Sequence, residues 1–233
     1  MIDPPYDPRP LFDHPYGALR VAGVTDDPPE PAAMARLLPE EHAFAAGLAP
    51  LRRGTWVAGR LALAAALAEV GAPRIPLLAT PRGAPAVPPG FVGSVSHKRN
   101  VAIAVAAPDT GAGLGADIEE LLPSKHDISR RILTPAELEA LDALPPEERF
   151  RRVLVVFSIK ESIYKAVDPF VRRYVGFKEA EVDPGPRAPG LHAAVARLSL
   201  ERGDRSFEVE AIWIELAAHV ITSARVRPTA DAR

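Results

Sequence analysis

Three acidic side chains and one lysine have the types and spacing of a site for phosphate chemistry. Asp117 and Glu119 alternate with apolar residues in GLGADIEE (113–120), so they share one face of a predicted strand, about 7 Å apart. Glu161 and Lys165 are four residues apart and share one side of a predicted helix. A third carboxylate from a helix would complete the oxygen ligands that Mg²⁺ prefers. The spacing makes Asp117, Glu119 and Glu161 a candidate metal site.

Each part of this site also has a purely structural interpretation. Glu161 and Lys165 could form an ordinary helical ion pair worth about 0.3–0.5 kcal/mol. Acidic residues such as Asp117 and Glu119 are also common on the exposed face of a strand. The spacing alone does not decide between these interpretations and a metal site.

The helix that must carry Glu161 is predicted over Phe150–Asp168, where no Gly or Pro interrupts. Its apolar residues recur at three- and four-residue spacing: Phe150, Val153, Leu154 and Phe157. This stripe predicts a core-facing side, and the same side continues into Glu161 and Lys165. Two charges therefore stand where packing alone would favour apolar residues.

Basic residues form a second group, in the first half of the chain. A helix is predicted from Pro50 to a stop at Gly71, and Arg53 and Arg60 lie two turns apart along one side of it. Both could reach the same anionic group, or each could be a solvated surface charge. His97 falls between two predicted strands, where a histidine is commonly a structural hydrogen-bonding group.

The remaining pattern predicts a mixed α+β fold. A helix is expected over Pro31–Gly47, and Thr134-Pro135-Ala136-Glu137 is a capping box that begins another. Alternating residues predict further strands: Leu19–Val24, Phe91–His97, Val101–Ala106, Leu191–Leu200, Ser206–Glu215 and Val220–Val226. The segment Pro108–Gly113 is the best candidate for a linker between two domains.

Composition limits the class of protein. The 233 residues are 47% hydrophobic with a formal charge of −2 and a pI near 6.3, so no basic field indicates nucleic-acid binding. No run of eighteen apolar residues predicts a membrane span, and the N-terminus lacks the features of a secretory signal. Cysteine is absent, which excludes disulfides and thiolate metal sites. We expect a cytoplasmic enzyme or binding protein.

Two motifs together carry a family resemblance. GADIE followed by FSIKESIYK (157–165) resembles the paired signature of the 4′-phosphopantetheinyl transferases. SVSHKRN (94–100) resembles the larger, two-lobed branch of this superfamily, which includes the surfactin-synthetase and enterobactin-synthase activating enzymes. The resemblance implies two similar α+β lobes with a pseudo-two-fold relation and a cofactor cleft between them. The lobes are expected at 1–110, with the basic residues, and at 111–233, with the acidic site and the motif helix.

The resemblance also implies roles for individual residues. Glu161 and Lys165 would be catalytic, with Glu161 taking the serine proton directly or through a metal-bound water. Asp117, Glu119 and Glu161 would bind Mg²⁺. The residues expected to contact coenzyme A are Arg53, Arg60, Arg82, Ser96, His97, Lys160 and Lys165.

The implied reaction transfers the 4′-phosphopantetheine arm of coenzyme A to a serine of an acyl or peptidyl carrier protein, and releases adenosine 3′,5′-bisphosphate. Such carriers serve fatty acid, polyketide, nonribosomal peptide and siderophore synthesis. We expect a monomer that docks carriers transiently on Leu121–Leu133. The alternatives are a Mg²⁺-dependent nucleotide phosphohydrolase and a noncatalytic module that binds coenzyme A or docks carriers.

Overall fold

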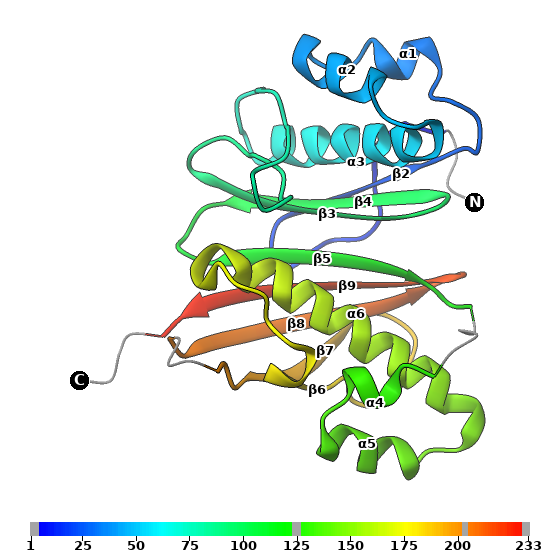
Figure 1. Cartoon of the computed structure of the whole chain (residues 1–233), viewed down its shortest axis with the longest axis vertical. Coiled ribbons are helices and arrows are strands. Elements are labelled where there is room, and N and C mark those ends of the chain that lie inside the picture. The colour runs from blue at the N-terminus through cyan, green and yellow to red at the C-terminus, as the bar shows by residue number, and fades with distance from the viewer. Residues whose placement is uncertain (1–4, 123–126, 202–204, 230–233) are drawn as a thin grey trace. The chain divides into compact units, whose positions relative to one another are not determined.

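The computed structural model describes residues 5–122, 127–201 and 205–229. The chain folds as two compact units, Met1–Thr110 and Gly111–Arg233 (Figure 1). Each unit combines an antiparallel sheet with one long helix packed on it, and the expected α+β class is confirmed. The pseudo-two-fold relation and the cofactor cleft between the lobes stay predictions.

Unit 1 is built on a four-stranded antiparallel sheet in the order β1-β2-β4-β3. Its strands are β1 (Arg9–Pro10), β2 (Ala18–Gly23), β3 (Phe91–Lys98) and β4 (Val101–Pro108). Its helices are α1 (Pro31–Met34), α2 (Pro39–Ala46) and α3 (Pro50–Glu69). The Ala- and Leu-rich face of α3 packs on β2, β3 and β4 and forms the core of the unit.

The prediction of a single helix over Pro31–Gly47 is wrong. Two short helices, α1 and α2, replace it, because Pro39 cannot donate a helical hydrogen bond and disfavours a helical conformation at the residue before it. Leu38 is accordingly extended, with φ −69° and ψ 159°. Pro39 is instead the first residue of α2, where its missing N–H costs nothing.

Unit 2 is built on a five-stranded antiparallel sheet in the order β5-β9-β8-β7-β6 (Figure 1). Its strands are β5 (Gly113–Glu120), β6 (Ala180–Asp183), β7 (His192–Leu198), β8 (Phe207–Leu216) and β9 (His219–Pro228). Its helices are α4 (Ser129–Ile132), α5 (Pro135–Asp142), α6 (Pro146–Val171) and the 3₁₀ turn η1 (Phe177–Glu179). The three predicted strands after residue 190 are confirmed within two residues at each end, whereas β6 was not predicted.

The long helix α6 forms as predicted, but its core face differs from the expected one. The residues of the predicted stripe are half-buried apart from Leu154. The fully packed side carries another set: Val155, Val156, Ile159, Ile163, Ala166 and Val167. Glu161 and Lys165 thus lie on the flank of α6 and do not interrupt its core face. No helix among the described residues is long and apolar enough to cross a membrane.

The connection that follows α6 is fastened by one buried carboxylate, that of Glu179. It accepts hydrogen bonds from the backbone N–H of Gly176 at 2.8 Å and of Glu201 at 2.9 Å. Arg173 donates two further bonds, at 3.0 and 2.6 Å. The Arg173 guanidinium lowers the pKa of Glu179 from 4.5 to about 2. The ionised form of Glu179 therefore holds η1 and the following chain together.

We predict that Glu179 contributes to the acid limb of stability. Because its folded-state pKa lies below the unfolded one, its contribution is fully present above pH 4.5 and is lost as pH falls toward 2. Glu179→Gln should lower the urea midpoint at pH 6, and the gap to wild type should close as pH falls from about 5 toward 2. An exposed acid, changed as Glu148→Gln, is the control. A gap that stays constant with pH would contradict the assignment.

Candidate functional site

The site in unit 2 depends on an unusually close approach of α6 to β5. A Cβ atom added at Gly113 would overlap the carbonyl oxygen of Ala166, and one at Gly115 would overlap that of Ser162. These two positions therefore need glycine, because only a residue without a side chain leaves room for the helix backbone. The next residue on this face of the strand is Asp117, which is thus brought directly under α6.

The Asp117 carboxylate is buried, with 4% of its residue surface exposed, and both of its oxygens accept hydrogen bonds. Lys165 Nζ lies 2.7 Å from Oδ1 and also donates to the carbonyl of Ala116 at 2.9 Å. Ser158 Oγ donates to Oδ2 at 2.8 Å. The structure therefore brings the predicted residues Asp117 and Lys165 into contact. The Lys165 side chain keeps 31% of its surface exposed, so its charge is accessible.

Glu119 and Glu161 come from the same two elements as this pair. Glu119 follows Asp117 on the same face of β5, and Glu161 is on α6, the helix that packs on that strand. Both are half-buried and both make further interactions. Within the described part of the chain, no three acidic or histidine side chains are close enough together to hold a metal ion. The chemistry of the donor set, three carboxylates, still fits Mg²⁺.

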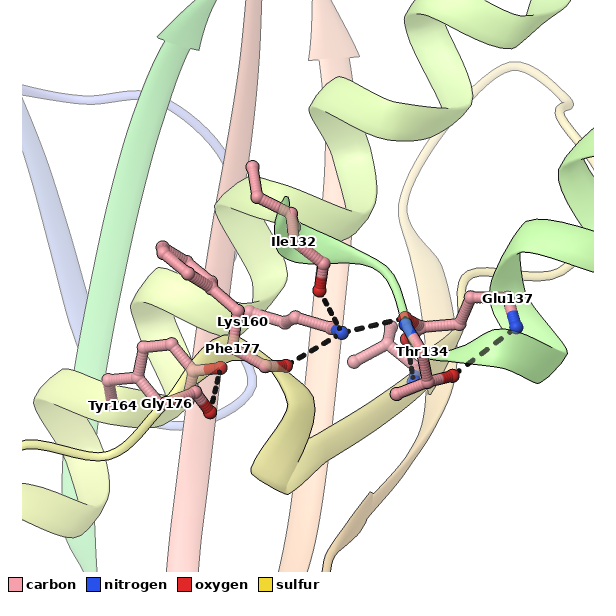
Figure 2. A network of polar contacts seen from close by, with 8 residues as sticks. Ile132, Thr134, Glu137, Lys160, Tyr164, Gly176 and Phe177 are labelled. Carbon is pink, nitrogen blue, oxygen red and sulfur yellow. Dashed lines mark hydrogen bonds and ion pairs between the residues drawn. The ribbon is translucent and has the colours of Figure 1, made fainter. Parts of the chain in front are cut away.

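Lys160, expected to contact coenzyme A, lies elsewhere, and the structure corrects that assignment. Its side chain is fully buried, and Nζ donates to Glu137 Oε2 at 2.7 Å and to the carbonyls of Ile132 and Phe177 at 2.9 Å each (Figure 2). These three acceptors use all three ammonium protons. Lys160 therefore has no donor left for a phosphate.

Glu137 completes this network as a buried acceptor. Its Oε2 also accepts from the backbone N–H of Thr134 at 2.7 Å, and its Oε1 from that of Val182 at 2.7 Å. Thr134 in turn caps the N–H of Glu137, so the predicted capping box is confirmed (Figure 2). The Lys160–Glu137 pair thus joins α6 to α5, η1 and β6.

Unit 1 places Arg53 and Arg60 in different environments, although both lie on α3. Arg53 donates to the carbonyls that end α2, from Nε to Ala45 and from Nη2 to Ala46 and Leu48, at 2.9 Å each. It therefore caps α2, and this contact accounts for the residue without a cofactor. Its expected contact with coenzyme A stays a prediction of the resemblance alone.

Arg60 is buried, with 7% of its surface exposed. Its guanidinium carbon lies 4.8 Å from the ring centroid of Trp56, and its Nε has no hydrogen-bond partner among the described residues. Burial lowers the pKa of Arg60 to about 10, so the side chain stays cationic at neutral pH. A buried cation with an open donor is suited to an anionic ligand.

The other predicted residues of unit 1 lie in two segments. Ser96 and His97 are on β3, where His97 is exposed and pairs across the ladder with Ala102. Arg82 is exposed in a tight turn closed by the hydrogen bond from Thr80 N to Ala84 O. Arg82, Ser96 and His97 all have further interactions.

Sequence reasoning named Glu137 for its capping box but missed its contact with Lys160. It also missed three buried hydroxyl residues around Asp117: Ser158, Ser162 and Thr222. Ser158 and Ser162 lie within the motif FSIKES, so their place next to Lys160 and Glu161 was a signal. Thr222 gave no such signal, because its position opposite Asp117 depends on strand pairing.

Comparison with known families assigns both halves of the chain. Residues 40–107 match the family described as the 4′-phosphopantetheinyl transferase N-terminal domain. Residues 113–217 match the 4′-phosphopantetheinyl transferase superfamily. The two matches fall in unit 1 and unit 2 respectively, and the second includes Asp117, Glu161 and Lys165.

Individual relatives agree with these matches. The 4′-phosphopantetheinyl transferase Svp of Streptomyces mobaraensis is 37% identical over 180 residues, which are 75% of this chain and 71% of Svp. The transferase PptT of Mycobacterium tuberculosis is 30% identical, over 62% of this chain and 64% of PptT. Enterobactin synthase component D of Salmonella typhimurium is 36% identical, over 56% and 54%.

These findings define the protein as an α+β transferase enzyme. The chain belongs to the 4′-phosphopantetheinyl transferase superfamily. The family expected from GADIE and FSIKESIYK is therefore confirmed.

We predict that Lys160 acts in folding and not in cofactor binding. Lys160→Met should lower the free energy of unfolding by about 3–5 kcal/mol, because it leaves the Glu137 carboxylate buried without its charge partner. Adding Glu137→Gln should recover part of that loss, since the unpaired charge is removed. Urea unfolding of the single and double variants measures both effects. Unchanged stability together with a raised KM for coenzyme A would restore the cofactor role.

Proposed function

We propose that this enzyme transfers the 4′-phosphopantetheine arm of coenzyme A to a serine of an acyl or peptidyl carrier protein. The contact between Asp117 and Lys165 carries the proposal at the level of the site, because it joins the acidic strand motif to the lysine of the helix motif. In the reaction, a bond forms between the serine oxygen and the phosphorus of the arm. The bond from that phosphorus to the bridging oxygen breaks, which releases adenosine 3′,5′-bisphosphate.

The side chains of unit 2 divide the work of this reaction. Glu161 accepts the serine proton as the new bond forms. Lys165, with its ammonium group held by Asp117 and the carbonyl of Ala116, offers positive charge to the pyrophosphate as negative charge develops on the leaving group. The partial exposure of Lys165 supports this role, since the charge is fixed in place yet reachable.

Coenzyme A contacts are assigned to Arg60, Arg82, Ser96 and His97, together with Lys165. The open, buried Nε of Arg60 supports an anionic ligand there, and a guanidinium presents a planar pair of donors to phosphate oxygens. His97 and Arg82 have exposed side chains, as a direct contact with a large co-substrate requires.

Mg²⁺ is part of the proposal, with Asp117, Glu119 and Glu161 as the residues that would hold it. When bound, the ion would neutralise charge on the pyrophosphate. Donor chemistry supports this assignment, and the shared strand face of Asp117 and Glu119 agrees with it. Lys165 and Ser158 each use one acceptor site on the oxygens of Asp117, and an ionised carboxylate has about four, so these contacts leave acceptor capacity for a metal.

The pathway and state of the enzyme are further proposals. We infer that its carriers belong to polyketide, nonribosomal peptide or siderophore synthesis, because a relative of this chain is an enterobactin synthase component. We further propose that the enzyme acts as a cytoplasmic monomer.

We predict that Asp117→Asn and Glu161→Gln each lower the rate of arm transfer by about 10²–10³-fold, because each removes a charge from the reacting centre. Thermal unfolding should stay close to wild type for Glu161→Gln, whose side chain is half-buried. The measurement is the mass of a carrier protein after incubation with coenzyme A and Mg²⁺, with metal-free samples alongside. Glu148→Gln, an exposed acid of the same helix, is the control.

Three outcomes separate the candidate functions. A mass gain of one arm on the carrier supports the transferase. Cleavage of coenzyme A without a mass gain would indicate the phosphohydrolase. Binding of coenzyme A with neither product would indicate the noncatalytic module. Wild-type turnover in both acidic variants would remove Asp117 and Glu161 from the site.

The carrier is proposed to dock on part of the segment Leu121–Leu133. Pro123–His126 lie outside the described residues. Among the described ones, Leu122, Asp127, Arg130 and Arg131 are exposed. The prediction that Ile132 lies on this surface is wrong, because its side chain packs in the core of unit 2 with 2% exposure. The surface that remains carries two cations, one acid and one exposed apolar side chain, and its net positive charge suits an acidic carrier.

We predict that Arg130→Glu with Arg131→Glu raises the KM for the carrier about tenfold at low salt and leaves the KM for coenzyme A unchanged. Charges at the rim of an interface act mainly on association, so the effect should shrink as salt increases. A matched double reversal, Arg172→Glu with Arg205→Glu, changes two other exposed cations of unit 2. Equal effects of both double variants would place docking elsewhere.

A further inference from the structure

Three buried hydroxyl groups lie close together beside the Asp117 carboxylate. Ser158 Oγ donates to Asp117 Oδ2 at 2.8 Å. Thr222 Oγ1 lies 3.0 Å from Ser158 Oγ and donates to the Ser158 carbonyl at 2.8 Å. Ser162 Oγ lies 2.7 Å from Thr222 Oγ1. None of the three hydroxyl residues is more than 1% exposed, so their hydrogen bonds depend on one another and not on water.

Counting protons shows where each of these hydroxyl groups donates. An ionised carboxylate can only accept, so the single proton of Ser158 is committed to Asp117. The proton of Thr222 is donated to the backbone carbonyl of Ser158, so the 3.0 Å contact between Ser158 Oγ and Thr222 Oγ1 has no proton of its own. Thr222 Oγ1 then accepts from Ser162 Oγ. Thr222 therefore holds the backbone of Ser158, and the hydroxyl of Ser158 in turn donates to the Asp117 carboxylate.

The fold places Thr222 at the centre of these contacts. Asp117 on β5 and Thr222 on β9 are direct partners in the antiparallel ladder, so both side chains point to the same face, beneath α6. Ser158 and Ser162 face them from consecutive turns of α6, where Gly115 lets the helix approach. The Asp117 side chain thus accepts from Lys165 on one oxygen and from Ser158 on the other, and Thr222 of the neighbouring strand holds Ser158.

We propose that Thr222 is a positioning residue for the transfer reaction. Acting through Ser158, it fixes the orientation of the Asp117 carboxylate and so the position of the Lys165 ammonium. This inference rests on the proposed transferase function, but its structural half does not. If Thr222 served packing alone, Thr222→Val, which keeps the branched shape, would leave the Asp117 carboxylate and the transfer rate unchanged.

The test compares variants that differ by one hydroxyl. Thr222→Val removes the hydroxyl at nearly constant shape, Thr222→Ser restores it, and Ser158→Ala breaks the next link. Ser223→Ala is the matched control, since Ser223 is equally buried on β9 but donates to the Gly115 carbonyl at 2.8 Å. Two measurements are made on the full chain: the kinetics of arm transfer, and the ¹³C resonance of the Asp117 carboxyl at neutral pH without substrates.

Thr222→Val and Ser158→Ala are expected to lower kcat about 10–100-fold while the KM for coenzyme A stays within about twofold. The Asp117 resonance should move in both, whereas Thr222→Ser and Ser223→Ala should match wild type. Wild-type kcat and an unmoved resonance in Thr222→Val would overturn the proposal. If Thr222→Val does not fold, Ser158→Ala decides by the same two readouts.

The two readouts also separate this inference from the proposed function. A wild-type enzyme that transfers no arm to a carrier would refute the transferase function, and the Asp117 resonance would still decide whether Thr222 positions the carboxylate. Transfer by wild type with equal loss in Thr222→Val and Ser223→Ala would refute the positioning role and leave the function intact.

Discussion

The direct backbone contact between α6 and β5 is the constraint on which the rest of unit 2 depends. Gly113 and Gly115 leave no side chain between strand and helix, so the main chains approach more closely than ordinary helix–sheet packing allows. Asp117 is the first residue on that strand face with a side chain, and it is forced into the narrow space beneath the helix. The GADIE motif thus combines a packing requirement with an acidic group, and the first explains where the second lies.

Such a place is costly for a carboxylate unless it is fully paired. Removing an ionised group from water costs several kcal/mol, and a partner charge offsets this only with good geometry and further hydrogen bonds. Asp117 has both, from Lys165 and Ser158. Lys160 and Glu137 form a second buried charge pair that is also fully hydrogen-bonded. All three ammonium protons of Lys160 are donated, and most lone pairs of the Glu137 carboxylate accept a hydrogen bond. Lys160 and Lys165 therefore have different roles, although both are lysines of the same motif.

The sequence predicts local features well and the environment of single polar residues poorly. The capping box at Thr134 and the helix carrying Glu161 depend on contacts between near neighbours, and both were predictable. The core face of α6 was not, because it includes the small polar residues Ser158 and Ser162, which do not resemble a hydrophobic stripe. Arg53 and Arg60 lie on the same side of α3, yet Arg53 caps α2 and Arg60 is buried against Trp56. That difference depends on where α2 ends, which no spacing on α3 records.

Glu161 lies between the two anchored lysines of α6, one residue after Lys160 and four before Lys165. Lys160 ties the helix to α5, η1 and β6, and Lys165 ties it to β5, so the turn that carries Glu161 is held from two sides. A group that accepts a proton gains from such restraint, because rigid elements hold it within a fraction of an ångström of a productive position. Loss of either anchor would loosen the same turn. In the motif K-E-x-x-x-K, the two lysines therefore restrain the helical turn that carries Glu161. Lys165 is also partly exposed at the proposed reaction site.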